Sequence, residues 1–456
     1  MDRKRFLKTA LGALLLCSLL IALLPGCMTA GERESFAPSA APSETPAPTP
    51  APTEPPTETP TEPPAQTPAP VLRPTPPSEP DYTEEPTPEP ETAAPKPTRT
   101  PAPTSTPKPG GGSDPEDEGD YDFTMMFVGD LMCLSGQQYG AMNQASGGDR
   151  FDFRPSFKYV KDLLSRADCA VGNLETTICD SWPYAYQQKE IDGKPNCNAP
   201  AKYLDALKYA GFDALAMCNN HCCDAGRQGI IDTIEAVEGR GFKHTGTFRS
   251  DSEKRWVMLS IKGVKVALLS YSEFYNGKQG CVGGDRFMLN TYSESTARRD
   301  IANARSAGAQ LVVVYEHWGR EHSHVPTDTV RRHARELANA GADIICGSHS
   351  HAVQPVVWLK ASDGRRVLCM YSLGNFVSSM SQQAANDTFI EEVRIKVTSG
   401  GRAKPVSEKS HTCRVFNSLG GKYFVVVPTS NTSIPSIRSQ LEAARERILA
   451  IIHSER

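Results

Sequence analysis

The sequence predicts an α/β fold in which parallel strands alternate with helices and carry polar side chains at their carboxyl ends. Two observations support this class. Apolar runs rich in β-branched residues recur along the chain, and segments with helical spacing of apolar residues separate them. The clearest unit is a strand at 311–315, a helix at 327–341 and a second strand at 344–346. This alternation favours strands that lie parallel in one sheet.

This strand-helix-strand unit predicts that three histidines lie close together. His317 follows the first strand, and His349 and His351 follow the second. The helix between them ends at Gly341, which is typical of a C-cap. A right-handed crossover of this length makes the two strands parallel, so their carboxyl ends share one edge of the sheet. Because neutral imidazoles are good ligands, we expect the three histidines to converge on a divalent metal.

Metal-competent side chains also follow three earlier apolar runs. They are Asp130 after 123–128, Glu175 after 168–171, and Asn220 with His221 after 214–217. Taken singly, each is also typical of a turn or a helix cap. Ligands of an α/β sheet bind beyond the carboxyl ends of its strands, so the repetition favours one common site. Oxygen and nitrogen ligands without thiolate indicate Mn, Fe or Zn.

The remaining patterns predict further elements of the same domain. Helices are expected at 155–167, 201–211 and 227–241, and a short strand followed by a hairpin at 241–271. Residues 272–292 lack periodicity and are interpreted as a loop over the site. Strands at 356–359, 365–377 and 387–397 are expected to form an antiparallel group. A strand at 423–428 and an amphipathic helix complete the chain.

The first 27 residues are typical of an export signal. Four of the first eight residues are basic, and the apolar run 11–24 is shorter than the roughly 20 residues that span a bilayer. Leu-Pro-Gly-Cys at 24–27 resembles a bacterial lipoprotein cleavage box, which implies a lipid on Cys27 and anchoring at the outer face of the cell membrane. Proline is unusual in this box, so anchoring by an uncleaved segment stays the alternative.

Residues 28–120 are predicted to be a disordered linker rich in proline and threonine. Of the 37 prolines, 26 lie between positions 36 and 110, where apolar residues able to pack are scarce. Such a composition favours an extended, semi-rigid spacer. The folded part is therefore expected at 121–456, which is long enough to bury a substantial core.

Charge and cysteine content limit the class of protein further. A net charge of −4 argues against a nucleic-acid-binding protein. Of the 13 cysteines, Cys17 and Cys27 belong to the expected signal, which leaves an odd number in the rest of the chain. We expect mostly reduced thiols, with a bridge between Cys179 and Cys197 as the favoured pair.

The ordered motifs resemble those of the CapA family of capsule and poly-γ-glutamate synthesis proteins. They are Gly-Asp at 129–130, Asn-Leu-Glu at 173–175, Asn-Asn-His at 219–221, His-Trp-Gly at 317–319, Gly-x-His-x-His at 347–351 and Ser-Leu-Gly-Asn-Phe at 372–376. That family is similar to calcineurin-like metallophosphoesterases. The resemblance implies a sandwich with α-β-β-α layers and a two-metal site between its two sheets.

The resemblance also implies a role for each candidate residue. One ion would be held by Glu175, Asn220, His317 and His349, a second ion by Asp130, Glu175 and His351, and His221 would act as the acid. Phosphoesterases usually have a histidine where this chain has Met132, so the second ion is one ligand short. Glu175 also replaces the usual bridging aspartate.

Two functions follow from these expectations. The first is a metal-dependent hydrolase or transferase that acts on an anionic polymer such as poly-γ-glutamate during capsule synthesis or export. The second is a non-catalytic subunit that holds the polymer among other capsule-synthesis membrane proteins and keeps a vestigial metal site. Retained ligands favour the enzyme.

Overall fold

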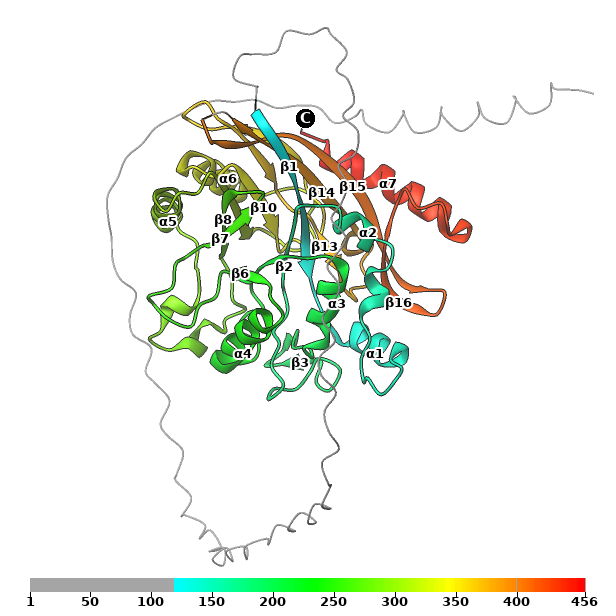
Figure 1. The fold of residues 1–456 in the computed structure, drawn as a ribbon. Coiled ribbons are helices and arrows are strands. Elements are labelled where there is room, and N and C mark those ends of the chain that lie inside the picture. Colours follow the sequence, from blue (N-terminus) through cyan, green and yellow to red (C-terminus); the bar gives the residue numbers. More distant parts are fainter. Residues whose placement is uncertain (1–118, 399, 456) are drawn as a thin grey trace, which may run out of the picture. The chain divides into compact units, whose positions relative to one another are not determined.

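The computed structural model describes residues 119–398 and 400–455 (Figure 1). The expected signal, Cys27 and nearly all of the proline-rich linker lie outside these residues. Within them, two β-sheets face each other and helices cover their outer faces (Figure 1). The predicted α-β-β-α sandwich is therefore confirmed.

The larger sheet has eight strands in the order β16-β15-β14-β1-β2-β5-β6, with β13 also paired to β1. Their bounds are β1 Gly119–Leu131, β2 Cys169–Asn173, β5 Ala214–Ala216, β6 Lys243–Thr245, β13 Asn375–Val377, β14 Asp387–Thr398, β15 Ala403–Leu419 and β16 Lys422–Pro428. The strands β1, β2, β5, β6 and β13 pair in parallel, and β14, β15 and β16 extend the sheet antiparallel.

The smaller sheet has six strands in the order β11-β12-β10-β9-β8-β7. Their bounds are β7 Val257–Ile261, β8 Val264–Ser272, β9 Leu311–His317, β10 Ile344–Ser348, β11 Val356–Lys360 and β12 Arg366–Met370. The expected hairpin is confirmed in β7 and β8, and β9 and β10 are parallel as predicted. A small ribbon of β3 Glu190–Ile191 and β4 Lys194–Pro195 lies apart from both sheets.

Helices pack on the outer faces of the sheets and on β14 and β15. The α-helices are α1 Ser135–Gln144, α2 Lys161–Leu164, α3 Lys202–Ala210, α4 Gly226–Gly239, α5 Glu294–Ser306, α6 Asp328–Ala340 and α7 Arg438–Ile452. Short 3-10 helices are η2 Arg154–Phe157, η3 Gln279–Val282, η4 Arg286–Met288, η5 Ala384–Asn386 and η6 Pro435–Ile437. At the start of α6, the Thr327 hydroxyl accepts a hydrogen bond from Val330 N–H. At its end, Gly341 adopts φ 116°, which confirms the predicted C-cap.

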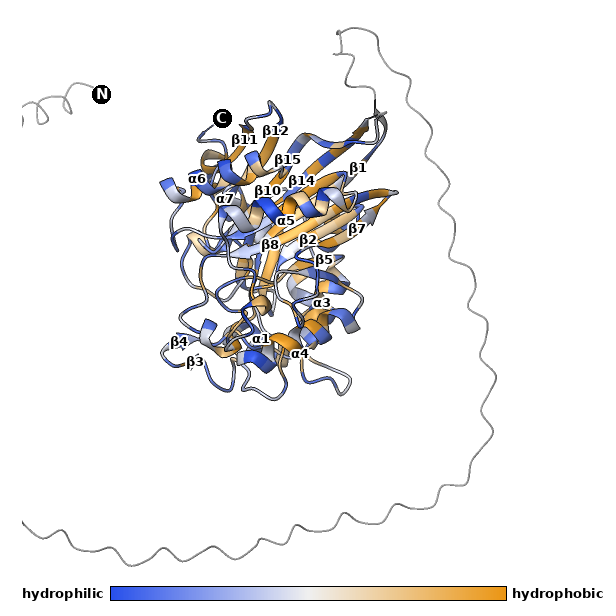
Figure 2. Cartoon of the chain, turned by 90° about the vertical axis from the view of Figure 1, so that its left-hand side faces the viewer, coloured by the Kyte–Doolittle hydropathy of each residue, from blue (hydrophilic) through white to orange (hydrophobic). Residues whose placement is uncertain are grey.

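Alternate residues of the central strands enter two different cores. In β1, Phe123, Met125 and Phe127 point between the sheets, whereas Met126 and Val128 point toward the helices outside. The strand β9 alternates in the same way between the inner core and the layer of α5 and α6. Figure 2 shows the hydrophobic colouring gathered on the strands and the hydrophilic colouring on outward parts of the helices.

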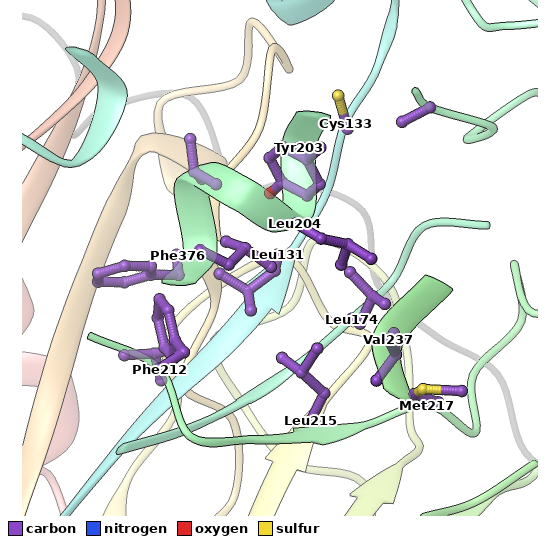
Figure 3. Packing of buried hydrophobic residues seen from close by; sticks show 14 of the residues in the cluster. Leu131, Cys133, Leu174, Tyr203, Leu204, Phe212, Leu215, Met217, Val237 and Phe376 are labelled. Atoms are coloured by element: carbon purple, nitrogen blue, oxygen red, sulfur yellow. The ribbon is translucent and has the colours of Figure 1, made fainter. Parts of the chain in front are cut away.

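The outer core of the larger sheet is built from aromatic and aliphatic side chains. Tyr203 and Leu204 of α3 pack with Leu131 at the end of β1 (Figure 3). The Tyr203 hydroxyl lies 3.0 Å from the carbonyl oxygen of Met132, so the buried phenol keeps a hydrogen-bond partner. This packing fixes the segment that follows Asp130.

Two glycines allow backbone segments to approach closely beside the site. A Cβ atom on Gly129 would lie 1.8 Å from the carbonyl oxygen of Gly374, and one on Gly347 would lie 1.9 Å from that of Tyr371. Neither backbone oxygen can rotate away as a side chain could. Glycine is therefore required where β1 and β10 deliver their site residues.

Some sequence predictions differ from the structure. The helix expected at 155–167 is broken into η2 and α2, and β13 pairs in parallel with β1 rather than joining an antiparallel group. The expected bridge between Cys179 and Cys197 is wrong, because both cysteines are free. Cys179 Sγ instead lies 3.0 Å from Asp232 Oδ2.

In the part of the chain that the structure describes, we find no helix long and apolar enough to span a membrane.

Candidate metal centre

All seven candidate site residues lie at the carboxyl ends of strands from both sheets. Asp130 is the last residue but one of β1, and His317 is the last residue of β9. The others follow their strands, with Glu175 after β2, Asn220 and His221 after β5, and His349 and His351 after β10. Beneath them, the Tyr315 hydroxyl lies 3.1 Å and 3.0 Å from the carbonyl oxygens of Val128 and Val171. These contacts connect the two sheets, so their strand ends meet at one place.

Glu175 is the centre of this arrangement. Its side chain is fully buried, and neither carboxylate oxygen has a hydrogen-bond partner. Burial, reinforced by the nearby Asp130 carboxyl, raises the pKa of Glu175 well above its ordinary value. A buried carboxylate without donors is costly unless it is protonated or faces a cation. The residue therefore fits a position that binds a metal ion.

One group of ligand atoms converges around His317. His317 Nε2 lies 3.0 Å from Asn220 Oδ1, 3.1 Å from His349 Nδ1 and 3.7 Å from Glu175 Oε1. Burial, followed by the neighbouring histidines, lowers the pKa of His317 well below its ordinary value, and burial lowers that of His349 to about 4. Both rings are thus neutral near pH 7, which is the form that coordinates metals.

A second group consists of Asp130, Glu175 and His351, whose ligand atoms all lie within 4.8 Å of one another. Asp130 Oδ2 lies 3.7 Å from His351 Nδ1 and accepts a hydrogen bond of 3.3 Å from His349 N–H. Burial raises the pKa of Asp130 to about 6, and burial lowers that of His351 to about 3. This group shares Glu175 with the first, so a single carboxylate faces both.

His221 is held by a hydrogen-bonded carboxylate. Its Nδ1 lies 2.7 Å from Asp224 Oδ2, while Asp224 Oδ1 accepts from Lys278 Nζ at 2.9 Å. Burial alone would raise the pKa of Asp224, but His221 and Lys278 keep it below its ordinary value. The ring therefore presents Nε2 toward Glu175, 3.9 Å from Oε1. This is the geometry of an oriented acid or base.

Cys197 lies beside this pair, and its ligand atom falls within 4.8 Å of those of His221 and Asp224. The thiol is fully buried, and burial raises its pKa well above the ordinary value. In the absence of a metal ion it is therefore a thiol and not a thiolate. Its backbone N–H donates to Asp224 Oδ2 at 3.0 Å, so the residue helps to hold the carboxylate.

The loop after β10 has an unusual backbone. His349 and His351 adopt φ values of 85° and 54°, in the left-handed region that non-glycine residues seldom use. Such strain persists only where surrounding contacts impose it, and it gathers at functional sites. Here His351 Nδ1 is fixed at 2.8 Å from Asn375 Oδ1. The loop thus holds the His351 ring against the larger sheet, whereas His349 Nδ1 lies 3.1 Å from His317 Nε2 of the smaller sheet.

A cavity of about 430 Å³ opens beside His349. Its other walls come from Glu321 and from residues 273–279 of the segment that the sequence predicted to cover the site. The predicted loop over the site is confirmed for these residues, whereas later parts of the segment 272–292 form η3 and η4. Phe274 packs against the His349 ring, with centroids 4.7 Å apart. The cavity gives a molecule of moderate size access to His349.

Four polar residues that support the site were given no role from the sequence. Asn173 Nδ2 donates to Asp130 Oδ1 at 2.8 Å, and Ser348 Oγ lies 2.8 Å from His317 Nδ1. Asp224 holds His221, and Asn375 holds His351. Each lies within three residues of a candidate residue or inside a motif already noted, which is the signal that could have identified them. Partners of this kind fix the ring orientation of metal-binding histidines.

Met132 occupies the position where a further histidine ligand was missing. Its side chain is buried in the core, and its carbonyl oxygen accepts a hydrogen bond from Gln137 Nε2 at 2.7 Å. The residue contributes nothing to the convergent cluster. The second group therefore holds three side chains.

The chain is similar to known proteins of capsule synthesis. The model of the family described as bacterial capsule synthesis protein PGA_cap matches residues 124–380. The chain is 29% identical over 285 residues to the PGA biosynthesis protein CapA of Bacillus subtilis (strain 168), covering 60% of this chain and 68% of that protein. It is 27% identical over 312 residues to the capsule biosynthesis protein CapA of Bacillus anthracis, covering 65% and 72%.

Among solved structures, the calcineurin-like phosphoesterase YfkN from Bacillus subtilis matches with a TM-score of 0.39 and 11% identity. That match covers 72% of this chain and 98% of the other. The family model spans more than half of the chain and includes every residue of the convergent cluster. The chain belongs to the bacterial capsule synthesis protein PGA_cap family.

Proposed function

We propose that this protein is a cell-surface enzyme of capsule synthesis or export that hydrolyses or transfers groups on an anionic polymer, with poly-γ-glutamate as the first candidate. The relative from Bacillus subtilis is named for PGA biosynthesis and the one from Bacillus anthracis for capsule biosynthesis, which supports this choice of polymer and process. The observation that carries the enzymatic part is the buried Glu175 carboxylate, which has no hydrogen-bond donor and faces two groups of ligands.

The residues present fit one or two divalent transition metal ions. Glu175, Asn220, His317 and His349 would hold one ion, and Asp130, Glu175 and His351 the other. When bound, such an ion supplies an activated water or polarises a carbonyl or phosphoryl oxygen. The mixture of carboxylate, amide and imidazole suits Mn, Fe or Zn.

The protein's own residues supply the proton transfer. Asp224 fixes the His221 ring through Nδ1, so Nε2 points into the cluster. In this position His221 protonates the leaving group as the scissile bond breaks. Lys278 stabilises the ionised form of Asp224, which keeps the ring in the orientation that this step requires.

The alternative is a subunit that holds the polymer without catalysis. Its support is the second group, which lacks a fourth side chain because Met132 lies in the core. On this alternative the protein assembles with other capsule-synthesis membrane proteins. An activity measurement separates the two functions.

The test is hydrolysis or transfer of γ-linked polyglutamate, together with a panel of phosphate esters, with and without added Mn²⁺. Wild-type protein should be active only with metal. His221→Ala and Asp224→Asn should each lose about 10²-fold or more of the activity. His244→Ala, which removes a histidine of β6 outside the cluster, should stay fully active. Equal activity in His221→Ala and wild type would overturn the proposed acid.

We also propose a lipid anchor at Cys27, which places the domain at the outer face of the cell membrane. The basis is the short apolar run that ends at Cys27. Mass spectrometry of the native protein should yield an N-terminal peptide that starts with a lipid-modified Cys27. A peptide that retains Met1 would instead support an uncleaved anchor.

A further inference from the structure

Two cavities of about 550 and 520 Å³ adjoin each other outside the candidate metal centre. They share Asp152, Arg154 and Tyr209, so they form one continuous groove, which we call the basic groove. Its walls come from η2, α3 and the β15–β16 hairpin, together with Arg240. None of the seven candidate site residues lines it.

Basic side chains outnumber acidic ones in this groove by six to three, although the whole chain carries a net charge of −4. Each aspartate has a basic partner. Arg154 pairs with Asp152 at 2.8 Å, Lys202 with Asp149 at 3.0 Å, and Arg240 with Asp205 at 2.6 Å. The positive charge in excess therefore belongs to the other three basic residues.

These three residues are Lys158, Lys208 and Lys422, and all are exposed. None of them forms an ion pair within residues 119–398 and 400–455. Aromatic rings hold two of the ammonium groups in position. Lys158 Nζ lies 5.5 Å from the Tyr159 ring centroid, and Lys208 Nζ lies 4.8 Å from that of Phe242. The groove thus offers separate ammonium groups that form no close ion pair among the described residues, although Lys422 and Lys208 interact electrostatically over a longer distance with Asp152 and Asp213.

An exposed aromatic ring lies where the two cavities join. Tyr209 keeps 37% of its surface accessible and is one of three exposed tyrosines among the described residues. A flat, exposed ring can pack against methylene groups while its neighbours bind charges. A ligand that alternates hydrocarbon with anionic groups would match both features.

We propose that the basic groove binds an extended chain of γ-linked polyglutamate at a place separate from the metal centre. The choice of polymer rests on the proposed function. Each ammonium group would pair with one carboxylate, and Tyr209 would contact the methylenes between them. Single exposed ion pairs are weak, so binding depends on several contacts along one chain. Both arginines already pair with aspartates, which leaves no free guanidinium to grip a phosphate backbone.

The test measures binding of fluorescently labelled γ-linked polyglutamate to the full-length protein by anisotropy. The groove variant is Lys158→Glu with Lys422→Glu, and the matched control is Lys254→Glu with Lys360→Glu. Lys254 and Lys360 are exposed lysines outside the groove, so both variants change the net charge equally. The groove variant should bind about tenfold more weakly or worse, and the control within about twofold of wild type. Added salt should weaken wild-type binding.

Equal loss in both double variants would overturn the groove as the binding site. Single-stranded DNA that binds as tightly as polyglutamate, with the same dependence on Lys158 and Lys422, would overturn the choice of a polycarboxylate. His349→Ala should bind the polymer like wild type. If polymer binding depends on the groove but no turnover is found, the proposed catalysis is refuted and the groove remains the binding site. If the groove variant binds and turns over the polymer like wild type, the groove is refuted and the proposed catalysis stands.

Discussion

At the scale of single residues, the candidate metal centre combines side chains whose pKa values shift in opposite directions. Burial raises the pKa of Asp130 to about 6, and it lowers those of His349 and His351 to about 4 and about 3. Both histidines are therefore ready to bind metal at any pH above about 5. The carboxyl group of Asp130 must lose its proton before it can bind a metal ion.

This difference predicts how metal affinity depends on pH. Asp130 holds its proton below about pH 6, so the affinity of the second group should fall as the pH drops through 6, with proton release on binding. Folding stability without metal should depend on pH in the opposite direction. Because the pKa of Asp130 is raised in the folded state, this residue stabilises the fold below its ordinary pKa of 3.8, and that stabilisation is lost as the pH rises through about 6.

Titration calorimetry with Mn²⁺ in buffers of different ionisation enthalpy measures both affinity and proton release. Asp130→Asn should abolish the step near pH 6. An affinity that stays flat through pH 6 and falls only near pH 4 would show that the histidines, and not the carboxyl group, control binding.

At the scale of elements, the end of β1 depends on a close contact between backbones. A methyl group on Gly129 would meet the carbonyl oxygen of Gly374 at 1.8 Å. Gly129→Ala should therefore lower the free energy of unfolding by about 3 kcal/mol, because the backbone beside Asp130 must move. Urea denaturation measures this change.

The matched control is Gly239→Ala near the end of α4, where no atom lies within 4 Å of the added Cβ. Alanine favours a helix, so this variant should be as stable as wild type or slightly more stable. If Gly129→Ala also keeps wild-type stability, the contact with Gly374 does not constrain β1.

Elements with regular patterns could be predicted from the sequence, and irregular ones could not. The unit of β9, α6 and β10 was predicted because its apolar residues follow strand and helix periods and Gly341 marks the helix end. By contrast, β15 was missed because its first half is rich in lysine, serine and glutamate, has few buried residues and contains Pro405. It is a strand because β14 pairs along it, a contact that local sequence does not encode.

The same reasoning applies to the site. Its seven candidate residues could be predicted because each follows an apolar run, and parallel strands bring such positions together. Supporting contacts such as Asn375 to His351 join residues 24 positions apart and required the fold. The Cys179–Cys197 bridge was predicted without knowledge of the surroundings of either cysteine. Spacing does not reveal that Cys197 is buried beside His221 while Cys179 faces Asp232.

At the scale of the whole molecule, the domain encloses its own core. Pairing of β1 with β14 begins at Gly119 and continues to Phe127, so the first described residues already belong to the sheet. We predict that a chain beginning at Gly119 unfolds at the same temperature as the longer protein, because residues 36–110 contain few apolar side chains that could pack. Scanning calorimetry checks this. A fall of many degrees would mean that the preceding segment stabilises the domain.

The central claim is that the buried cluster around Glu175 holds a transition metal, and metal content tests it most directly. Elemental analysis of purified wild-type protein should find about one tightly held equivalent, with a second taken up weakly, because one group has four ligands and the other three. His349→Ala should lose the tight ion, whereas His221→Ala should keep it, since His221 is assigned to proton transfer and not to coordination. Wild-type protein that contains no metal and fails to bind added Mn²⁺, Fe²⁺ or Zn²⁺ would contradict the claim.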